Sequence, residues 1–295
     1  MIRPIQYLRG IAAMMVVWHH ALGQIALSHQ LTDLPPFGGY GVDLFFVISG
    51  FIMLVTTWDK PITPVEFIKH RIRRVVPLYW LATSLMVVGA IAAPFMFKTL
   101  KWDAAALTKS LLFVPYENLS FPGTISPLLV PGWSLNYEMF FYAIFALLLL
   151  VGRGWRVPLM IGALSVLVAA GRIWHPASAP LQVYTNPVML EFAAGMILGR
   201  LYVMKKHVRQ DGHAVLMALG DASYSIYLTH IFTLGAVRVV WMRFVPTASM
   251  TTSIVWMVFA LTACAVAGWA CYWLVEKPMT RRRHGSVERE ARQSA

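Results

Sequence analysis

Long apolar runs separated by short polar gaps recur along the whole chain. About 20 consecutive apolar residues are enough for a helix to cross the hydrocarbon core of a bilayer. We therefore predict an all-α, polytopic transmembrane bundle with eight firm spans and an upper limit of ten, forming one membrane domain over 1–280. The eight predicted spans are 5–27, 41–57, 74–96, 134–151, 156–173, 187–203, 222–244 and 251–275.

A ninth apolar stretch, 104–114, is too short to cross a bilayer comfortably. Prolines follow it at Pro115, Pro122, Pro127 and Pro131. Because proline cannot donate a backbone hydrogen bond, such a segment is tolerated at membrane depth only where protein or water covers it. We expect a re-entrant loop or a segment that lies on the surface.

Composition supports a membrane protein over a soluble one. Of the 295 residues 58% are hydrophobic and 13% are charged, whereas an average soluble domain has about 25% charged residues. The net charge of +12 would suit nucleic acid, but Lys and Arg stand at the ends of the apolar runs. There they set membrane topology and attract anionic lipid. We expect membrane lipid and no nucleic acid among the partners.

The positions of the basic residues predict the orientation in the membrane. With the N-terminus inside, nineteen of the 25 Lys and Arg fall on the cytoplasmic side and six on the other. Cytoplasmic loops are rich in Lys and Arg, so both termini should be cytoplasmic, with 281–295 as a disordered basic tail. A crossing by 104–114 would move every later loop to the opposite side, which fits the charges less well.

The first predicted helix carries two ionisable residues on one face. Arg9 and His20 are eleven residues apart, which corresponds to about 16 Å of rise and a nearly whole number of turns. Arg9 would lie near the cytoplasmic end and His20 deep in the membrane, where an ionisable group is costly and therefore a functional candidate. His19 faces about 100° away and is the weaker candidate. A role in helix packing remains an alternative for Arg9 and His20.

Four basic residues crowd the start of the third predicted span: Lys69, Arg71, Arg73 and Arg74. Arg71 and Arg74 share a helix face, from which two guanidinium groups could bind phosphate oxygens. Anchoring by the positive-inside rule explains one or two of these charges. Phosphate binding and topology thus remain two interpretations of this cluster.

Glu138 opens an aromatic membrane segment, PGWSLNYEMFFYAIF. A carboxyl group at that depth is either paired or protonated. It could orient His20 or take part in proton movement, and a capping role is the alternative. Further candidates in apolar surroundings are Asp43, Ser49, Trp133, Glu191, Ser223, Tyr227 and His230. Hydrogen bonding between helices is the alternative role of the polar ones.

The chain has no HExxH, CxxC, G-x-S-x-G or Walker sequence. We therefore expect no metal and no permanently bound cofactor, and any chemistry must rest on His, Glu, Arg and hydroxyl groups.

Seven blocks in order along nearly the whole chain resemble the acyltransferase-3 family of bacterial membrane O-acyltransferases, and most closely its exopolysaccharide-acetylating branch. The blocks are IQYLRGIAAMMVVWHH, GVDLFFVISGFIM, FIKHRIRRVVPLYW, PGWSLNYEMFFYAIFALLL, PVMLEFAAGMILG, GDASYSIYLTHIF and VEKP. The resemblance implies an Arg followed after ten residues by a His, which falls on Arg9 and His20. It also implies that Arg71 and Arg74 serve an acyl-CoA donor and that Glu138 belongs to the working core.

Family members commonly have more than eight spans. This chain is therefore either a short member or one in which 104–114 and another stretch complete the bundle.

From these observations we expect an enzyme of the bacterial inner membrane. It would transfer an acetyl or other short acyl group from cytoplasmic acetyl-CoA or another acyl-CoA, as donor substrate, to a hydroxyl of an exopolysaccharide or its lipid-linked precursor. Arg71, Arg73 and Arg74, with Arg9, would bind the donor phosphates, and one continuous passage would lead inward to His20.

His20 would act as general base or carry the acyl group transiently. Glu138 or a hydroxyl group would hold its tautomer or the oxyanion. Alternatives are a proton-coupled transporter of glycan or lipid, for which we see no paired repeats, and a non-catalytic scaffold, which has no need of buried ionisable groups.

Overall fold

The structure is a computed structural model that describes residues 2–26, 34–205, 213–244 and 249–280. These residues form an all-helical bundle, as predicted, and their only extended pairing is an isolated bridge between Glu117 and Ile125. The long helices are α1 (Arg3–Ala26), α2 (Tyr40–Trp58), α3 (Pro64–Ala92), α5 (Trp133–Leu148), α6 (Arg153–Trp174), α8 (Met189–Lys205), α10 (Ser223–Phe244) and α11 (Met250–Cys271). The shorter ones are α4 (Ala104–Leu111), α7 (Ala179–Tyr184), α9 (Ala214–Asp221) and α12 (Lys277–Thr280), with a π-helical turn at Tyr272–Glu276. The predicted tail, 281–295, lies outside the described residues.

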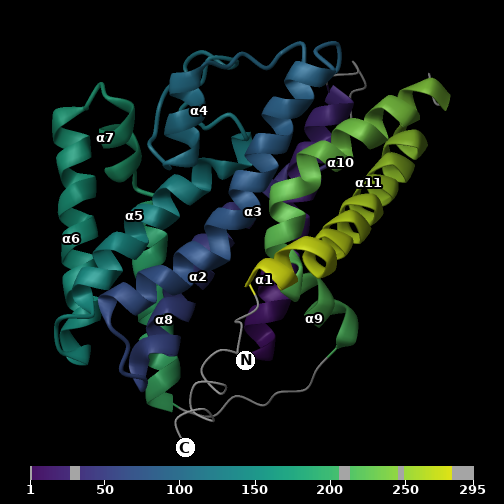
Figure 1. The fold of residues 1–295 in the computed structure, drawn as a ribbon. Helices are drawn as coiled ribbons and strands as arrows, with labels where there is room; N and C mark the ends of the chain where they lie inside the picture. The colour runs from purple at the N-terminus through teal and green to yellow at the C-terminus, as the bar shows by residue number, and fades with distance from the viewer. Residues whose placement is uncertain (1, 27–33, 206–212, 245–248, 281–295) are drawn as a thin grey trace, which may run out of the picture.

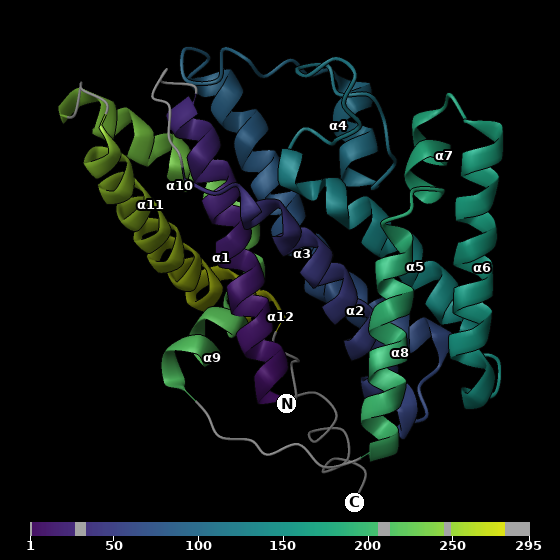
Figure 2. The ribbon, with the colours of Figure 1, turned by 180° about the vertical axis from the view of Figure 1, so that it is seen from behind.

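The long helices alternate in direction between two ends of the bundle (Figure 1). The start of α1, the connections 59–63 and 149–152 and the end of α8 lie at the lower end in that view, together with α9. The helices α4 and α7 lie at the opposite end, as the view from behind also shows (Figure 2). The group α1, α9, α10 and α11 lies on one side and the group α5 to α8 on the other, with α2 and α3 between them.

Six helical segments of the described chain are long and apolar enough to cross a membrane: Phe37–Trp58, Pro64–Ala92, Arg153–Trp174, Ala179–Lys205, Ser223–Phe244 and Met250–Thr280. These six segments identify the chain as a multi-pass membrane protein. Two of the eight predicted spans are missing from this set. Helix α5 has only 16 residues, and the 24-residue α1 contains Arg9, His19 and His20, which lower its mean hydropathy. Crossing by α1 and α5, and the cytoplasmic side of the termini, stay predictions.

Helix α3 begins ten residues before the predicted start, at Pro64. The hydroxyl oxygen of Thr63 accepts a hydrogen bond from the backbone N–H of Glu66 at 3.2 Å, and the Glu66 carboxylate accepts one from the backbone N–H of Thr63 at 3.1 Å. This capping box, with proline in the first turn, starts the helix. The basic cluster 69–74 is therefore inside α3, not before it, and the helix fixes the directions of its side chains.

The stretch 104–114 does not cross the bundle. Helix α4 has eight residues, which is about 12 Å of rise. The hydroxyl of Tyr79 donates to the carbonyl of Ser110 at 3.1 Å, and the indole N–H of Trp80 donates to the carbonyl of Leu111 at 2.8 Å. The end of α4 is thus docked on α3, in agreement with the predicted short segment.

Helices α2 and α8 pack closely because glycines lie at their interface. A Cβ atom on Gly50 would collide with the carbonyl oxygen of Phe192, and one on Gly195 would collide with that of Val47. Small residues let membrane helices approach each other where lipid offers no hydrophobic driving force. This contact fixes the position of α2, which carries Ser49 into the site described next.

Candidate active site

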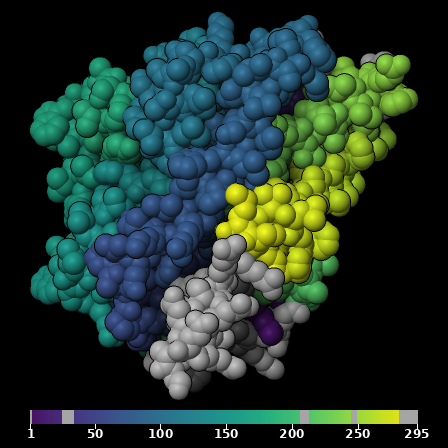
Figure 3. Space-filling model, in the orientation of Figure 1, coloured from purple at the N-terminus to yellow at the C-terminus, as the bar shows by residue number. Residues whose placement is uncertain are grey.

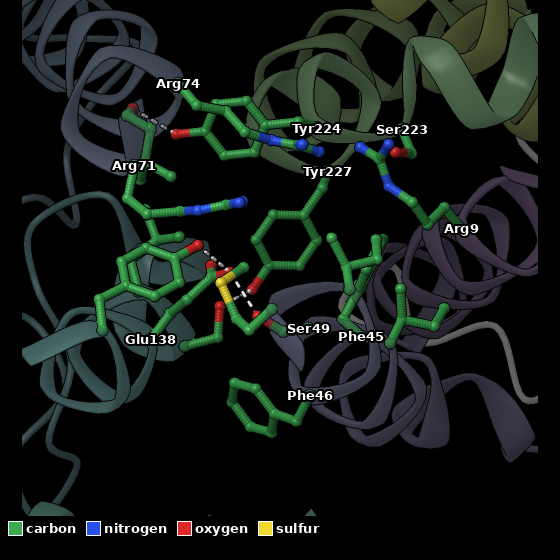
Figure 4. A pocket seen from close by; sticks show the side chains of 17 residues that line it. Arg9, Phe45, Phe46, Ser49, Arg71, Arg74, Glu138, Ser223, Tyr224 and Tyr227 are labelled. Atoms are coloured by element: carbon green, nitrogen blue, oxygen red, sulfur yellow. Dashed lines mark hydrogen bonds between the residues drawn. The ribbon is translucent and has the colours of Figure 1, made fainter. Parts of the chain in front are cut away.

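A cavity between α1, α2, α3, α5 and α10 collects about half of the polar residues that the sequence singled out (Figure 4). It contains about 690 Å³ of space unfilled by protein atoms, counting the part that is open to solvent. Its polar lining residues are Arg9, Ser49, Arg71, Arg74, Ser134, Glu138, Tyr142, Ser223, Tyr224 and Tyr227. Because the arginines lie in the first halves of α1 and α3, the cavity is in the half of the bundle that contains the chain's N-terminus.

Three guanidinium groups reach this cavity from two helices, and among the residues that the structure describes a single carboxylate lines it. Arg9 is 9% exposed, and its Nη1 donates to the side-chain oxygen of Gln6 at 2.8 Å. The amide of Gln6 in turn donates to the Asp221 carboxylate at the end of α9, at 2.5 Å. Arg9 is therefore held in place from α9, a helix that the sequence analysis did not predict.

The other two guanidinium groups come from α3. That of Arg71 lies over the rings of Phe67 and Tyr142, with its carbon 5.3 and 5.9 Å from their centroids. Its Nε is buried and has no hydrogen-bond partner among the described residues. Arg74 lines the same cavity one turn further along α3. An excess of buried positive charge with unused donors is suited to an anionic ligand.

Glu138 is held by two hydroxyl groups. Its Oε1 accepts hydrogen bonds from Ser49 of α2, at 3.1 Å, and from Tyr142 one turn along α5 (Figure 4). These bonds join α2 to α5 and keep the carboxylate facing the cavity. Tyr142 was not predicted, although its spacing of four from Glu138 places both on one helix face.

Tyr227 closes one side of the cavity. Its hydroxyl donates to the carbonyl of Pro131 at 2.6 Å, and the hydroxyl of Ser134 lies 2.7 Å from it. Tyr224, another residue that was not predicted, donates to the carbonyl of Val75 at 2.7 Å. The hydroxyl groups of both tyrosines therefore join α10 to neighbouring parts of the bundle.

His20 lies outside the cavity lining, next to His230 of α10. Its Nδ1 is 3.0 Å from the carbonyl of Val16, and its ring centroid is 4.7 Å from that of His230. His230 is in turn 6.2 Å from the ring of Tyr227. The lining of this cavity includes Arg9 and Tyr227 but not His20, and the continuous passage from Arg9 to His20 stays a prediction.

Several candidates lie outside the cavity. Arg73 and His19 are exposed, so Arg73 does not share a site with Arg71 and Arg74. Trp133 packs against the rings of Phe46 and Tyr137. Asp43 is half-buried in the first turn of α2. Among the described residues, no group of three or more His, Cys, Asp or Glu side chains could hold a metal ion.

Glu276, from the VEKP block, received no role in the sequence analysis. It is 6% exposed and accepts a hydrogen bond from the hydroxyl of Ser225 at 2.5 Å. The π-helical turn Tyr272–Glu276, an element often found at functional sites, sets its direction. Helix α12, which follows this turn, lies against α3, and Figure 3 shows the yellow end of the described chain beside the blue segment. Its charge acts on Arg9 and Arg74, so the cavity has a second acidic neighbour beyond its lining.

Comparison with known proteins identifies the family. The family model for the acyltransferase domain of the acyltransferase-3 family matches residues 3–212. The chain is 37% identical to exopolysaccharide production protein ExoZ of Rhizobium meliloti, over 83% of this chain and 90% of the relative. It is 30% identical to peptidoglycan O-acetyltransferase OatA of Listeria monocytogenes, over 65% of this chain and 34% of the relative. It is 28% identical to acyltransferase MdmB of Streptomyces mycarofaciens, over 84% of this chain and 68% of the relative.

No solved structure matches the chain. The match of the family model and the extent of the similarity to ExoZ confirm the resemblance that the seven sequence blocks indicated. The chain therefore belongs to the acyltransferase-3 family and is a membrane O-acyltransferase.

Proposed function

We propose that the protein transfers an acetyl or other short acyl group from cytoplasmic acyl-CoA to a hydroxyl of an exopolysaccharide or its lipid-linked precursor, in the bacterial inner membrane. The observation that carries the proposal is the convergence of Arg9, Arg71 and Arg74 in one cavity with a single carboxylate, Glu138. Coenzyme A carries a diphosphate and a 3′-phosphate, and guanidinium groups bind such oxygens in pairs. The names of the relatives, which refer to exopolysaccharide production and peptidoglycan O-acetylation, support a carbohydrate acceptor.

His20 is the proposed general base. A carbonyl oxygen can only accept, so the contact between Nδ1 of His20 and the carbonyl of Val16 assigns the hydrogen to Nδ1. The neutral ring then has its lone pair on Nε2. In the transfer step Nε2 takes the proton from the acceptor hydroxyl as its oxygen bonds to the acyl carbon. The carbon–sulfur bond breaks, and the leaving thiolate receives the proton from His20.

His20 is next to His230, and His230 is next to Tyr227, which lines the arginine cavity. We infer that the acyl end of the donor passes close to the Tyr227 ring to reach His20. Glu138 is the proposed counter-charge that keeps Arg9 and Arg71 directed into the cavity, and its charge acts on both.

The test uses purified protein in lipid nanodiscs with radiolabelled acetyl-CoA and a polysaccharide or lipid-linked repeat unit as acceptor. Wild type should release free thiol and label the acceptor. Replacing His20→Ala should reduce transfer about 100- to 10,000-fold, the usual contribution of a general base. The neighbouring exposed residue supplies the matched control, since His19→Ala should transfer at nearly the wild-type rate.

Transfer by His20→Ala at the wild-type rate would remove the proposed base. Glycan movement across proteoliposomes without any thiol release from acyl-CoA would instead support the transporter alternative.

A further inference from the structure

His230 is a fully buried residue with one unsatisfied ring nitrogen. It is 0% exposed, and its Nδ1 lies 2.6 Å from the carbonyl of Tyr227. Its Nε2 is buried and has no hydrogen-bond partner among the described residues. Leaving a buried polar atom unpaired is costly, so such an atom in a folded protein calls for a physical explanation.

The nearest ring to His230 on α1 is that of His20. The two centroids are 4.7 Å apart, and the ring planes are inclined at 57°. Each Nδ1 faces a backbone carbonyl of its own helix, Val16 for His20 and Tyr227 for His230. Both Nδ1 atoms therefore carry the hydrogen, and both Nε2 atoms have a lone pair when the rings are neutral. Two adjacent acceptors can share one additional proton.

We propose that His230 is a positioning residue for acyl transfer: its Nε2 accepts a hydrogen bond from the Nε2–H of His20 after His20 has taken the proton of the acceptor hydroxyl. This inference rests on the proposed function, since it requires His20 as the base. The acceptor loses its O–H bond, and the proton moves to His20 and then to the thiolate. His230 exchanges no proton in this cycle and stabilises the positive ring.

A structural role makes a different demand on His230. The bond from Nδ1 to the Tyr227 carbonyl would hold α10 locally and orient the Tyr227 ring at the cavity wall. That role uses Nδ1 alone and leaves the buried Nε2 unexplained. The two nitrogens can therefore be tested separately.

Asparagine and glutamine each reproduce one of the two nitrogen positions. His230→Asn keeps an amide donor near Nδ1 and has nothing at Nε2, whereas His230→Gln keeps an acceptor near Nε2. We expect His230→Asn to lower kcat about 10- to 100-fold, the usual effect of removing one hydrogen bond to a charged group. KM for acetyl-CoA should stay within about twofold, because the donor phosphates bind elsewhere. His230→Gln should recover most of kcat.

Wild-type kcat in His230→Asn would overturn the inference, and so would an equal loss of kcat in both variants with unchanged CoA affinity. If His230→Asn fails to fold, as judged by lost CoA binding, the inference is tested on the wild-type protein by NMR. Nitrogen-15 NMR of labelled histidine should show coupling between the two Nε2 atoms once His20 is protonated, and no coupling would overturn the inference.

The two proposals fail in distinguishable ways. Acyl transfer by His20→Ala at the wild-type rate would contradict both the role of His20 as general base and this inference. An inactive His20→Ala beside a fully active His230→Asn removes the inference alone. In the His20→Ala background His230→Asn should cause no further loss, because His230 acts only through His20.

Discussion

Glu138 of α5 accepts a hydrogen bond from the hydroxyl of Ser49 of α2, 3.1 Å away and 89 residues earlier in the chain. Together with the bond from Tyr142, this hydrogen bond directs the one carboxylate that the described residues place in the cavity lining toward the three arginines. The charge of Glu138 acts on Arg9 and Arg71. Charge and hydrogen bonding at this residue can be separated by mutation.

Glu138→Gln keeps the shape of the side chain and removes its charge. We expect kcat/KM for acyl transfer to fall about 10- to 100-fold, because breaking a buried charge arrangement costs more than losing a neutral hydrogen bond. Ser49→Ala leaves the charge of Glu138 and its hydrogen bond from Tyr142 in place, so it should cost less, about fivefold. Transfer rates in nanodiscs provide the measurement, and an effect of Ser49→Ala as large as that of Glu138→Gln would argue against a role for the charge.

Arg74→Gln should weaken donor binding, because Arg74 lines the cavity. We expect KM for acyl-CoA to rise about 10- to 100-fold, as for loss of one hydrogen bond to a charged group. Arg73 is the matched control: it is adjacent and equally basic but exposed outside the cavity, and Arg73→Gln should change KM by less than about twofold. Similar KM values for the two variants would mean that these charges serve topology and not the donor.

Gly195→Ala should destabilise the contact between α2 and α8. Its Cβ would overlap the carbonyl oxygen of Val47, so we expect a loss of about 1–3 kcal/mol in the free energy of unfolding. Gly162→Ala in α6 is the control, because a Cβ there meets nothing within 4 Å and alanine favours a helix. Unfolding in mixed detergent measures both. A Gly195→Ala protein as stable as Gly162→Ala would contradict the close packing.

Cysteine labelling tests the orientation. The exposed positions Gly152 and Ser178 lie at opposite ends of α6, and the charge distribution predicts that Gly152 faces the cytoplasm. In a background without Cys264 and Cys271, a membrane-impermeant maleimide added to intact cells should label Ser178→Cys and leave Gly152→Cys unlabelled until lysis. The reverse labelling pattern would mean that the bundle has the opposite orientation in the membrane.

Apolar length predicted most helices well, because a run long enough to cross a bilayer is visible in one segment of sequence. Apolar length did not predict the helical segments that are polar or short. Helix α3 starts at Pro64 with a basic turn that carries no apolar run, although Thr63 and Glu66 form a recognisable capping box. Helix α9 has only eight residues and depends on contact with α1, so its own sequence gives little sign of it.

Part of the site was predicted by residue type and spacing. An ionisable group deep in a membrane is costly, and this cost singled out His20 and Glu138, whereas helix spacing singled out Arg9 and the shared face of Arg71 and Arg74. The spacing of Arg9 and His20 suggested one passage. In the structure Arg9 faces the cavity and His20 faces His230, because the position of α10 and not helix periodicity decides which neighbours a face meets.

The order of residues along the chain was enough to identify a helical membrane bundle, its family, and the ionisable groups available for chemistry. These depend on the local properties of hydropathy, charge and ordered motifs. The folded structure was needed to find that Ser49 donates to Glu138, that Gln6 links Arg9 to Asp221, and that the rings of His20 and His230 are neighbours. Such contacts join residues up to 215 positions apart and arise from how whole helices pack, which no single segment encodes.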